Sequence, residues 1–458
     1  MGTTEQIVKN IVATDFDSLD SEAVRRAKWR VLDAVGCLIG GANAPGCPVM
    51  VDLVRKWGGV GESTVLVHGV KGPAHNVAMT NSLMTRSYDY EPVEADGEGA
   101  SSPAHISGTT VPTALTLAER QGASGKDLLT ALLLGDDLAS RLGVASGFSF
   151  DLGWDNTGTI NMLGATAIAS KLLRLDEKQV LNALGIALNQ MAGTMDGVFD
   201  KTLTFKLPIA LASRNAIFSA ELAGQGFSGV KDPLLGDHGF FSLYCRNYNT
   251  ENLTKNLGKR FYSDRVIKPY SCCRANHSAV DSALKIAGAH DIRPEDVEEI
   301  VIYLTPAIRD GFVGQPFYIG ETPQVNAAFS ITYTVATALL RKEVRPKYFT
   351  DEFIRDPKVN MLIDKIRLEP SIPPEKKLTT EIRLKRTDGE VFSAHTDFPT
   401  GDFYETPLTD EEIKAKYRDN VAFSQTVSTE NAEKALEIAG ALEELGDVRE
   451  LTSLLVRE

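Results

Sequence analysis

The sequence predicts a mainly α-helical protein in which a large helical domain is joined to a smaller α+β domain. The first half of the 458-residue chain contains one apolar or amphipathic helical segment after another, without strand signals between them. After about residue 290, stretches rich in β-branched residues alternate with helical segments. This change from helices alone to strands and helices predicts two differently built domains.

The expected helices of the first half are bounded by capping residues and glycines. In residues 22–39, Ala27, Val31 and Val35 share one face, and Gly40 and Gly41 follow them. The other segments with a helical pattern are residues 112–120, 126–142, 163–173, 177–191 and 213–223. Together they are expected to form a helical domain over residues 1–267.

The smaller domain is expected over residues 268–404. Its strand candidates are residues 297–304, 365–368, 378–384 and 390–397, and Asp388-Gly389 is a hairpin-turn signal between the last two. Helical patterns cover residues 327–340 and 350–354. Residues 407–418 and 429–445 are helical again, so the segment from about 405 to 458 is expected to complete the helical domain.

Composition excludes several classes of function. The chain has 48 Lys and Arg against 61 Asp and Glu, a net charge of −13, which argues against a nucleic-acid partner. The five cysteines are odd in number and form no C-x-x-C pair, so neither a disulfide framework nor an iron–sulfur cluster is expected. Residues 1–20 lack the apolar core of a signal peptide, and no segment has the apolar length of a membrane span. We therefore expect a cytoplasmic protein without a membrane partner.

Three segments place rare polar residues among small or apolar ones. Residues 81–108 hold Asp89 between two tyrosines and His105 in a loop before a helix. Residues 202–215 hold Lys206 between apolar neighbours, where burial would lower its pKa. The third segment, residues 268–281, carries Lys268, Arg274 and His277. Taken singly, each has an ordinary alternative: His105 as a solvated loop residue, Lys206 reaching to the surface, Asp89 as a turn former.

Several catalytic motifs are missing from the sequence. It contains no H-E-x-x-H, no EF-hand loop, no G-x-x-x-x-G-K-[ST] and no G-x-S-x-G. Metal, nucleotide and serine-hydrolase sites therefore lack support, and no metal is expected.

The ordered set of motifs resembles the MmgE/PrpD family, which includes 2-methylcitrate dehydratase, cis-aconitate decarboxylase and iminodisuccinate epimerase. The likeness runs along almost the whole chain, and its most specific match is KPYSCCRANHSAVDSAL. The other matching segments are RAKWRVLDAVGCLIGG, NSLMTRSYDYE, PAHISG, WDNTGT, FKLPIALASRNA, QVNAAFSITYTVATALL and PLTDEEIKAKYRD.

The resemblance implies a helical domain with a smaller lid domain, an active site between them, a homodimer and no cofactor. Carried over by position, the catalytic candidates are Asp89, His105, Lys206, His277 and Tyr333, and the substrate-binding candidates are Arg86, Asp155, Lys268 and Arg274. Two of these depart from the family pattern, because Arg86 and Asp155 stand where histidine is common. The departures weaken an assignment to methylcitrate or cis-aconitate.

The expected function is that of a cofactor-independent lyase, a dehydratase acting on a small di- or tricarboxylic hydroxy acid. His105 or Asp89 would take the proton, and His277 would protonate the departing hydroxyl group. Lys206 and Lys268 would neutralise carboxylates, and Tyr333 would donate a hydrogen bond or shuttle a proton. Epimerisation of a dicarboxylate and decarboxylation of the cis-aconitate type are the alternatives. A non-catalytic paralogue that only binds a carboxylate is a further one.

Overall fold

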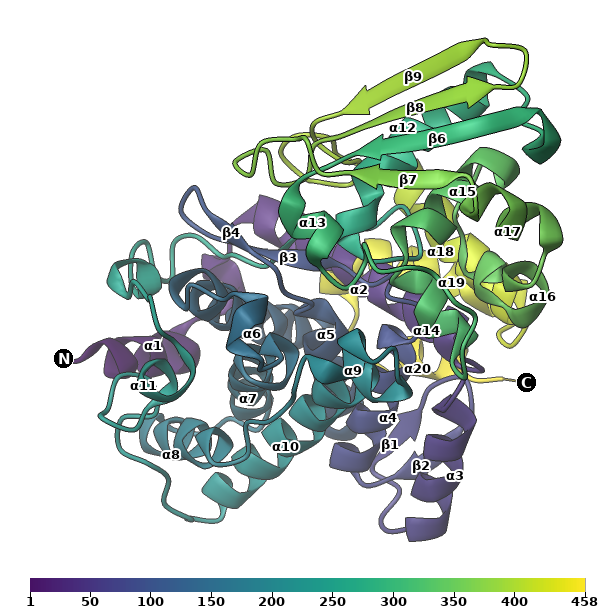
Figure 1. Ribbon diagram of the computed structural model, residues 1–458. Helices are drawn as coiled ribbons and strands as arrows, with labels where there is room; N and C mark the ends of the chain where they lie inside the picture. Colours follow the sequence, from purple (N-terminus) through teal and green to yellow (C-terminus); the bar gives the residue numbers. More distant parts are fainter. Residues whose placement is uncertain (458) are drawn as a thin grey trace.

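Packed helices make up most of the molecule, in a computed structural model that describes residues 1–457 (Figure 1). The helices of the first half are α1 Thr3–Ala13, α2 Ser21–Gly41, α3 Cys47–Trp57, α4 Ala74–Arg86, α5 Ser107–Gln121, α6 Gly125–Ala145, α7 Ile160–Leu172, α8 Glu177–Leu188, α9 Asp196–Phe199, α10 Leu207–Gly224 and α11 Phe240–Tyr244. Among them, α6 packs against α7, and α10 packs against α4, α7 and α8.

The helical half also contains short strands, so the prediction that it has none is wrong. A hairpin of β1 Ser63–Val65 and β2 Val70–Gly72 follows α3. A second sheet has the order β4-β3-β5, from β3 Val93–Asp96, β4 Ser101–Ser102 and β5 Asp264–Val266. These strands have two to four residues, too few for the alternation that identifies a strand in sequence.

The second half carries a four-stranded sheet of order β7-β6-β8-β9, at the top of Figure 1. Its strands are β6 Val297–Tyr303, β7 Ile366–Glu369, β8 Thr380–Arg386 and β9 Val391–Thr396. As predicted, β8 and β9 form a hairpin, and Gly389 turns it with a φ of +91°. Helix α12, His277–Ala289, packs against β8 and β9.

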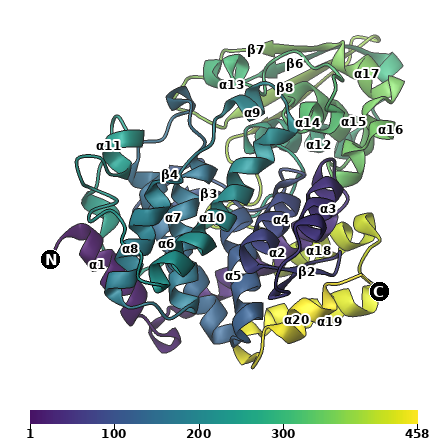
Figure 2. The ribbon, with the colours of Figure 1, turned by 90° about the horizontal axis from the view of Figure 1, so that it is seen from below.

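The remaining helices flank this sheet or return to the first half. They are α12 His277–Ala289, α13 Pro306–Asp310, α14 Pro323–Ala328, α15 Ile331–Arg341, α16 Asp351–Ile354, α17 Pro357–Ile363, α18 Asp410–Ser424, α19 Thr429–Gly440 and α20 Arg449–Leu454. Both α18 and α19 pack against α2, so the C-terminal helices return to the helical half, with α18 next to α2 in Figure 2. None of the helices in the described part of the chain is long and apolar enough to cross a membrane.

Most predicted helices are present with shifted ends, and two differ more. The helix expected over residues 327–340 is split into α14 and α15, because Ser330 caps a new helix by accepting a hydrogen bond from the Tyr333 amide. Helix α5 begins five residues before the predicted start at Pro112. Asp264 stabilises this extension, since its carboxylate accepts hydrogen bonds from the amides of Ile106 and Ser107.

Candidate active site

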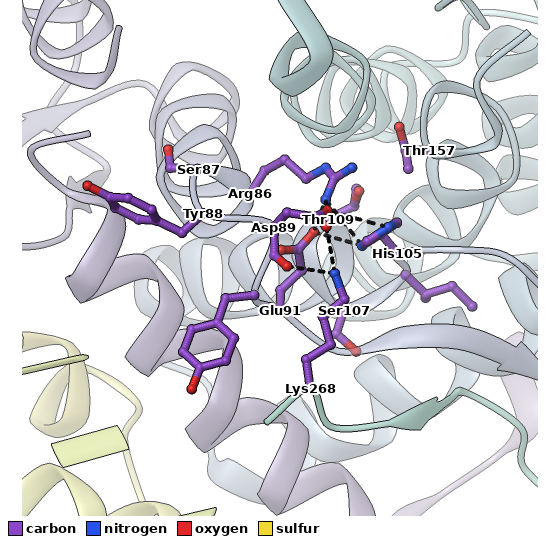
Figure 3. Close-up of polar contacts among 12 residues, drawn as sticks. Arg86, Ser87, Tyr88, Asp89, Glu91, His105, Ser107, Thr109, Thr157 and Lys268 are labelled. Atoms are coloured by element: carbon purple, nitrogen blue, oxygen red, sulfur yellow. Dashed lines mark hydrogen bonds and ion pairs between the residues drawn. The ribbon is translucent and has the colours of Figure 1, made fainter. Parts of the chain in front are cut away.

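Five charged or titratable side chains meet at the end of α4, and we call them the charged cluster (Figure 3). Arg86, the last residue of α4, lies at the centre: its Nη1 contacts the carboxylate of Asp89 and lies 2.9 Å from Oε1 of Glu91. The same nitrogen is 3.3 Å from Nδ1 of His105. Lys268 completes the cluster, with its Nζ 2.9 Å from Oδ2 of Asp89.

The backbone after α4 turns so that its acidic residues face Arg86. Asp89 has a φ of 49°, in the left-handed region that Asp tolerates better than most residues. Lys268 lies just after β5, which pairs with β3, the strand that begins two residues after Glu91. The small β4-β3-β5 sheet therefore brings residues 179 positions apart into contact.

His105 is fixed through its backbone and one ring nitrogen. Asn161 donates a 2.7 Å hydrogen bond to the His105 carbonyl, and Nδ1 lies 2.9 Å from Oε1 of Glu91. Because a carboxylate only accepts, Nδ1 carries the proton and Nε2 keeps its lone pair. The His105 side chain is 18% exposed, against 1% for Asp89 and 0% for Glu91. Of these three side chains, His105 is therefore the one that solvent or a substrate can reach.

The charges of the cluster shift one another's pKa. Burial alone would raise the pKa of Asp89, but Lys268 and Arg86 outweigh it and hold that pKa below its usual value. Glu91 likewise has a lowered pKa, since Arg86 and His105 outweigh its burial. Burial and the Arg86 charge lower the pKa of His105, while Glu91 opposes them. At pH 7 the cluster thus holds two carboxylates, two fixed cations and a neutral imidazole.

Lys206 is buried beside the cluster. Its Nζ donates to the Pro45 carbonyl at 2.8 Å and to the Ser87 hydroxyl at 3.1 Å. Burial lowers its pKa, as the sequence predicts. The Phe205 ring links it to Arg86, because both cations lie over that ring, Nζ of Lys206 at 5.8 Å and Cζ of Arg86 at 5.2 Å.

His277 begins α12 with both ring nitrogens engaged. Nε2 lies 3.2 Å from the Cys272 carbonyl and therefore carries the proton, while Nδ1 lies 3.4 Å from Nη1 of Arg274. Burial, Arg274 and Lys268 lower the pKa of His277 well below its usual value. This arrangement holds His277 neutral at pH 7 and does not favour the predicted role of proton donor.

Arg274 and Tyr333 have partners away from the charged cluster. Arg274 donates to the carbonyls of Thr400 at 2.9 Å and Pro399 at 3.1 Å. These bonds hold the loop of residues 399–400 beside His277. The Tyr333 hydroxyl is buried and donates to the Tyr348 carbonyl. The structure therefore does not bring Tyr333 to the cluster, and we do not carry its predicted catalytic role further.

Asp155 lies at the edge of the site. Its carboxylate caps a short 3-10 helix by accepting from the Thr157 amide at 2.9 Å and hydroxyl at 2.7 Å. It also contributes to raising the pKa of Arg86, together with Glu91 and Asp89. Asp155 thus acts on Arg86 through its charge.

Glu91 is the functional residue that the sequence did not single out. It lies in an acidic stretch with Glu94, Asp96 and Glu98, and sequence alone does not tell which carboxylate points inward. In the structure Glu91 is buried against His105 and Arg86. Its signals in the sequence are its place two residues after Asp89 and at the end of the segment NSLMTRSYDYE.

The cluster also has the composition of a metal site. Ligand atoms of Asp89, Glu91 and His105 lie within 4.8 Å of one another. Nη1 of Arg86 contacts both carboxylates and lies 3.3 Å from His105. A divalent cation bound there would have to displace a guanidinium group, so these residues do not fit a metal in this arrangement.

Comparison with known proteins identifies the family. The model of the MmgE/PrpD N-terminal domain matches residues 5–252, and that of the MmgE/PrpD C-terminal domain matches residues 270–444. The chain belongs to the MmgE/PrpD family. Both departures from the MmgE/PrpD pattern, Arg86 and Asp155, lie in or beside the charged cluster.

Three curated MmgE/PrpD relatives are each 25% identical to the chain. The cis-aconitate decarboxylase-like protein oryM of Aspergillus oryzae aligns over 96% of this chain and 94% of its own length. The cis-aconitate decarboxylase of Aspergillus terreus aligns over 99% and 96%, and that of Homo sapiens over 99% and 94%. The similarity therefore extends over almost the whole length of this chain and of each relative.

Proposed function

We propose that this protein is a cofactor-independent lyase that dehydrates a small di- or tricarboxylic hydroxy acid by acid–base catalysis. The observation that carries the proposal is the His105–Glu91 pair, a partly exposed imidazole held by a buried carboxylate next to Arg86 and Lys268. A base of this kind beside fixed cations suits removal of a proton from carbon next to a carboxylate. The carboxylate-processing relatives support the substrate class.

His105 is proposed as the general base. Nδ1 is tied to Glu91, so Nε2 accepts the proton from the substrate carbon. Glu91 orients the ring and stabilises the imidazolium that forms, as a carboxylate partner does in other histidine-dependent enzymes. The electrons of the broken C–H bond form the double bond as hydroxide leaves the neighbouring carbon.

The cations of the site are proposed to stabilise the negative charge that develops. Arg86 and Lys268 are both buried, and a buried cation interacts more strongly with a developing enolate than an exposed one. Asp89 holds both cations in place through its two carboxylate oxygens. We therefore assign Asp89 the role of fixing the cations rather than that of taking the proton.

Proton donation to the departing hydroxyl group is assigned to Lys206. Burial lowers the pKa of its ammonium group, which makes it a stronger acid than a free lysine. His277, the sequence-based candidate, is neutral and has both nitrogens bonded within the protein. Lys206→Met is therefore expected to lower kcat more than His277→Gln.

Decarboxylation is the second candidate, because the three relatives are named for cis-aconitate decarboxylase chemistry. The same base and cations can serve it, since loss of carbon dioxide also leaves an anion that must be stabilised and protonated.

One assay in deuterated water separates the reactions. EDTA-treated enzyme is incubated with a panel of hydroxy di- and tricarboxylates and with cis-aconitate, and products are followed by NMR. Formation of an alkene from a hydroxy acid supports dehydration, whereas release of carbon dioxide shows decarboxylation. Deuterium exchange at one carbon without loss of water shows epimerisation. Binding without turnover of any panel acid would show a carboxylate-binding paralogue and contradict the proposal.

The protein is further proposed to act as a homodimer. Helix α3 exposes Val49, Leu53 and Trp57, spaced four residues apart on one side, with 64%, 37% and 54% of their surface accessible. Sedimentation is expected to give twice the 49.7 kDa of one chain, and a monomer at micromolar concentration would contradict the assembly.

A further inference from the structure

The segment that carries Asp89 is held by side chains from the second half of the chain. Residues 87–90, the 87–90 segment, lie between α4 and β3 and belong to neither a helix nor a strand. Each of its four carbonyl groups accepts a hydrogen bond from a distant side chain: Ser87 from Gln324 at 2.5 Å, Tyr88 from Ser271 at 3.1 Å, Asp89 from Lys268 at 2.6 Å and Tyr90 from Lys416 at 2.7 Å.

These bonds matter because the 87–90 segment has no secondary structure to hold it. Its residues are buried, and a buried carbonyl without a partner is costly. The left-handed conformation of Asp89 also needs support from its surroundings. The directions of the Asp89 and Glu91 carboxylates follow from the peptide groups between them, so the donors to this backbone control the geometry of the charged cluster.

Among these four donors, Lys416 is a buried lysine that contacts no side chain of the charged cluster. It lies on α18, is 1% exposed, and its Nζ forms a 2.7 Å ion pair with Asp33 of α2. The ammonium also lies 3.8 Å from the centre of the Tyr90 ring. A buried ion pair adds little stability relative to apolar residues of the same size, so stability alone does not account for it.

We propose that Lys416, held by Asp33, is a positioning residue that fixes the peptide between Asp89 and Glu91 for the acid–base reaction. The expected effect of Lys416 on catalysis rests on the proposed function, whereas its effect on the 87–90 segment does not. Lys416 contacts the Tyr90 carbonyl and ring, whereas Lys268 contacts the Asp89 carboxylate itself. Lys416 therefore acts on the site through the backbone.

The test compares Lys416→Met with a matched control, Lys365→Met. Lys365 likewise donates to backbone carbonyls, those of Pro294 and Val297 at 2.7 and 2.6 Å, but it lies just before β7 in the second half. Because Lys416→Met leaves Asp33 buried and unpaired, the double variant Asp33→Asn/Lys416→Met is made as well, which removes both charges. Lys416→Arg keeps a donor and a cation at the position.

Two readouts are taken on each folded variant. Hydrogen exchange of the peptide that covers residues 86–91, followed by mass spectrometry, is expected to rise at least tenfold in both Lys416→Met variants and to stay unchanged in Lys365→Met. With the substrate identified by the panel assay, kcat is expected to fall by about 10- to 100-fold with KM changed less than about threefold, and Lys416→Arg to recover part of the loss.

The positioning role is overturned if exchange of residues 86–91 is unchanged, or rises equally in the control, or if kcat keeps its wild-type value. The outcome is separable from that of the proposed function. If no panel acid is turned over by the wild-type enzyme, the proposed reaction fails, while the exchange measurement still decides whether Lys416 holds the 87–90 segment.

Discussion

At the scale of single residues, the proposed function depends on which groups set the pKa of His105. Glu91 lies 2.9 Å from Nδ1 and raises this pKa, whereas burial and the Arg86 guanidinium lower it. The two charged neighbours therefore act in opposite directions on the same imidazole. Their removal should move the pH dependence of catalysis in opposite directions.

Glu91→Gln is expected to lower the pKa of His105 and to reduce kcat by about 100-fold. The imidazolium loses its stabilising carboxylate, so the acid limb of the kcat/KM profile should move to lower pH. A pH–rate profile measures both effects. An acid limb that moves to higher pH would show that Glu91 does not act on His105.

Arg86→Gln is expected to raise the pKa of His105, since it removes a cation that disfavours the imidazolium. The acid limb of kcat/KM should therefore move to higher pH, and KM should increase because a substrate carboxylate loses a partner. The same profile, recorded beside that of Glu91→Gln, is the check. Shifts of both variants in the same direction would refute this electrostatic account of the cluster.

The residue scale also shows what sequence could and could not predict. Asp89, His105, Lys206 and Lys268 are polar residues in small or apolar surroundings, and the structure places all of them at or beside the cluster. Glu91 is one of several acidic residues in a short segment, so its role follows only from the structure, where its carboxylate points toward Arg86 and His105. Tyr333 lies in a segment that matches the family, but its hydroxyl donates to the Tyr348 carbonyl, away from the cluster.

At the scale of elements, the start of α5 positions His105. Asp264 accepts from the Ile106 amide at 3.2 Å and from the Ser107 amide and hydroxyl at 2.7 Å. Since Asp264 lies on β5, it joins the strand that leads to Lys268 with the helix that follows His105. Sequence could not show this bond, because its partners are 157 and 158 residues apart.

Burial raises the pKa of Asp264 to about 7, which gives a prediction for stability. The contribution of this group to stability is full below about pH 4 and is lost as the pH rises towards 7, because ionisation is costlier in the folded state than in the unfolded one. The difference corresponds to about 4 kcal/mol.

Asp264→Asn removes this ionisation while keeping an acceptor oxygen. The difference in unfolding free energy between wild type and Asp264→Asn, measured by urea titration at several pH values, should shift in favour of the variant by up to about 4 kcal/mol between pH 4 and pH 8. A difference independent of pH would contradict a raised pKa at this position.

At the scale of the whole molecule, residues from distant parts of one chain form the site. The helices and the hairpin of β8 and β9 were predictable, because periodicity and turn residues are local signals. The small β4-β3-β5 sheet was not, since its strands are short and β5 follows β4 only after about 160 residues. That sheet and the bonds to the 87–90 segment bring Lys268 to Asp89.

The proposed reaction begins with His105, which removes a proton from a carboxylate substrate. Its most direct test is the kcat of His105→Asn with the substrate found in the panel assay, together with the Kd of that substrate. We predict that kcat falls by about 1000-fold while Kd changes less than about threefold, because the base is lost and the cations remain. A kcat within twofold of the wild-type value would contradict the account.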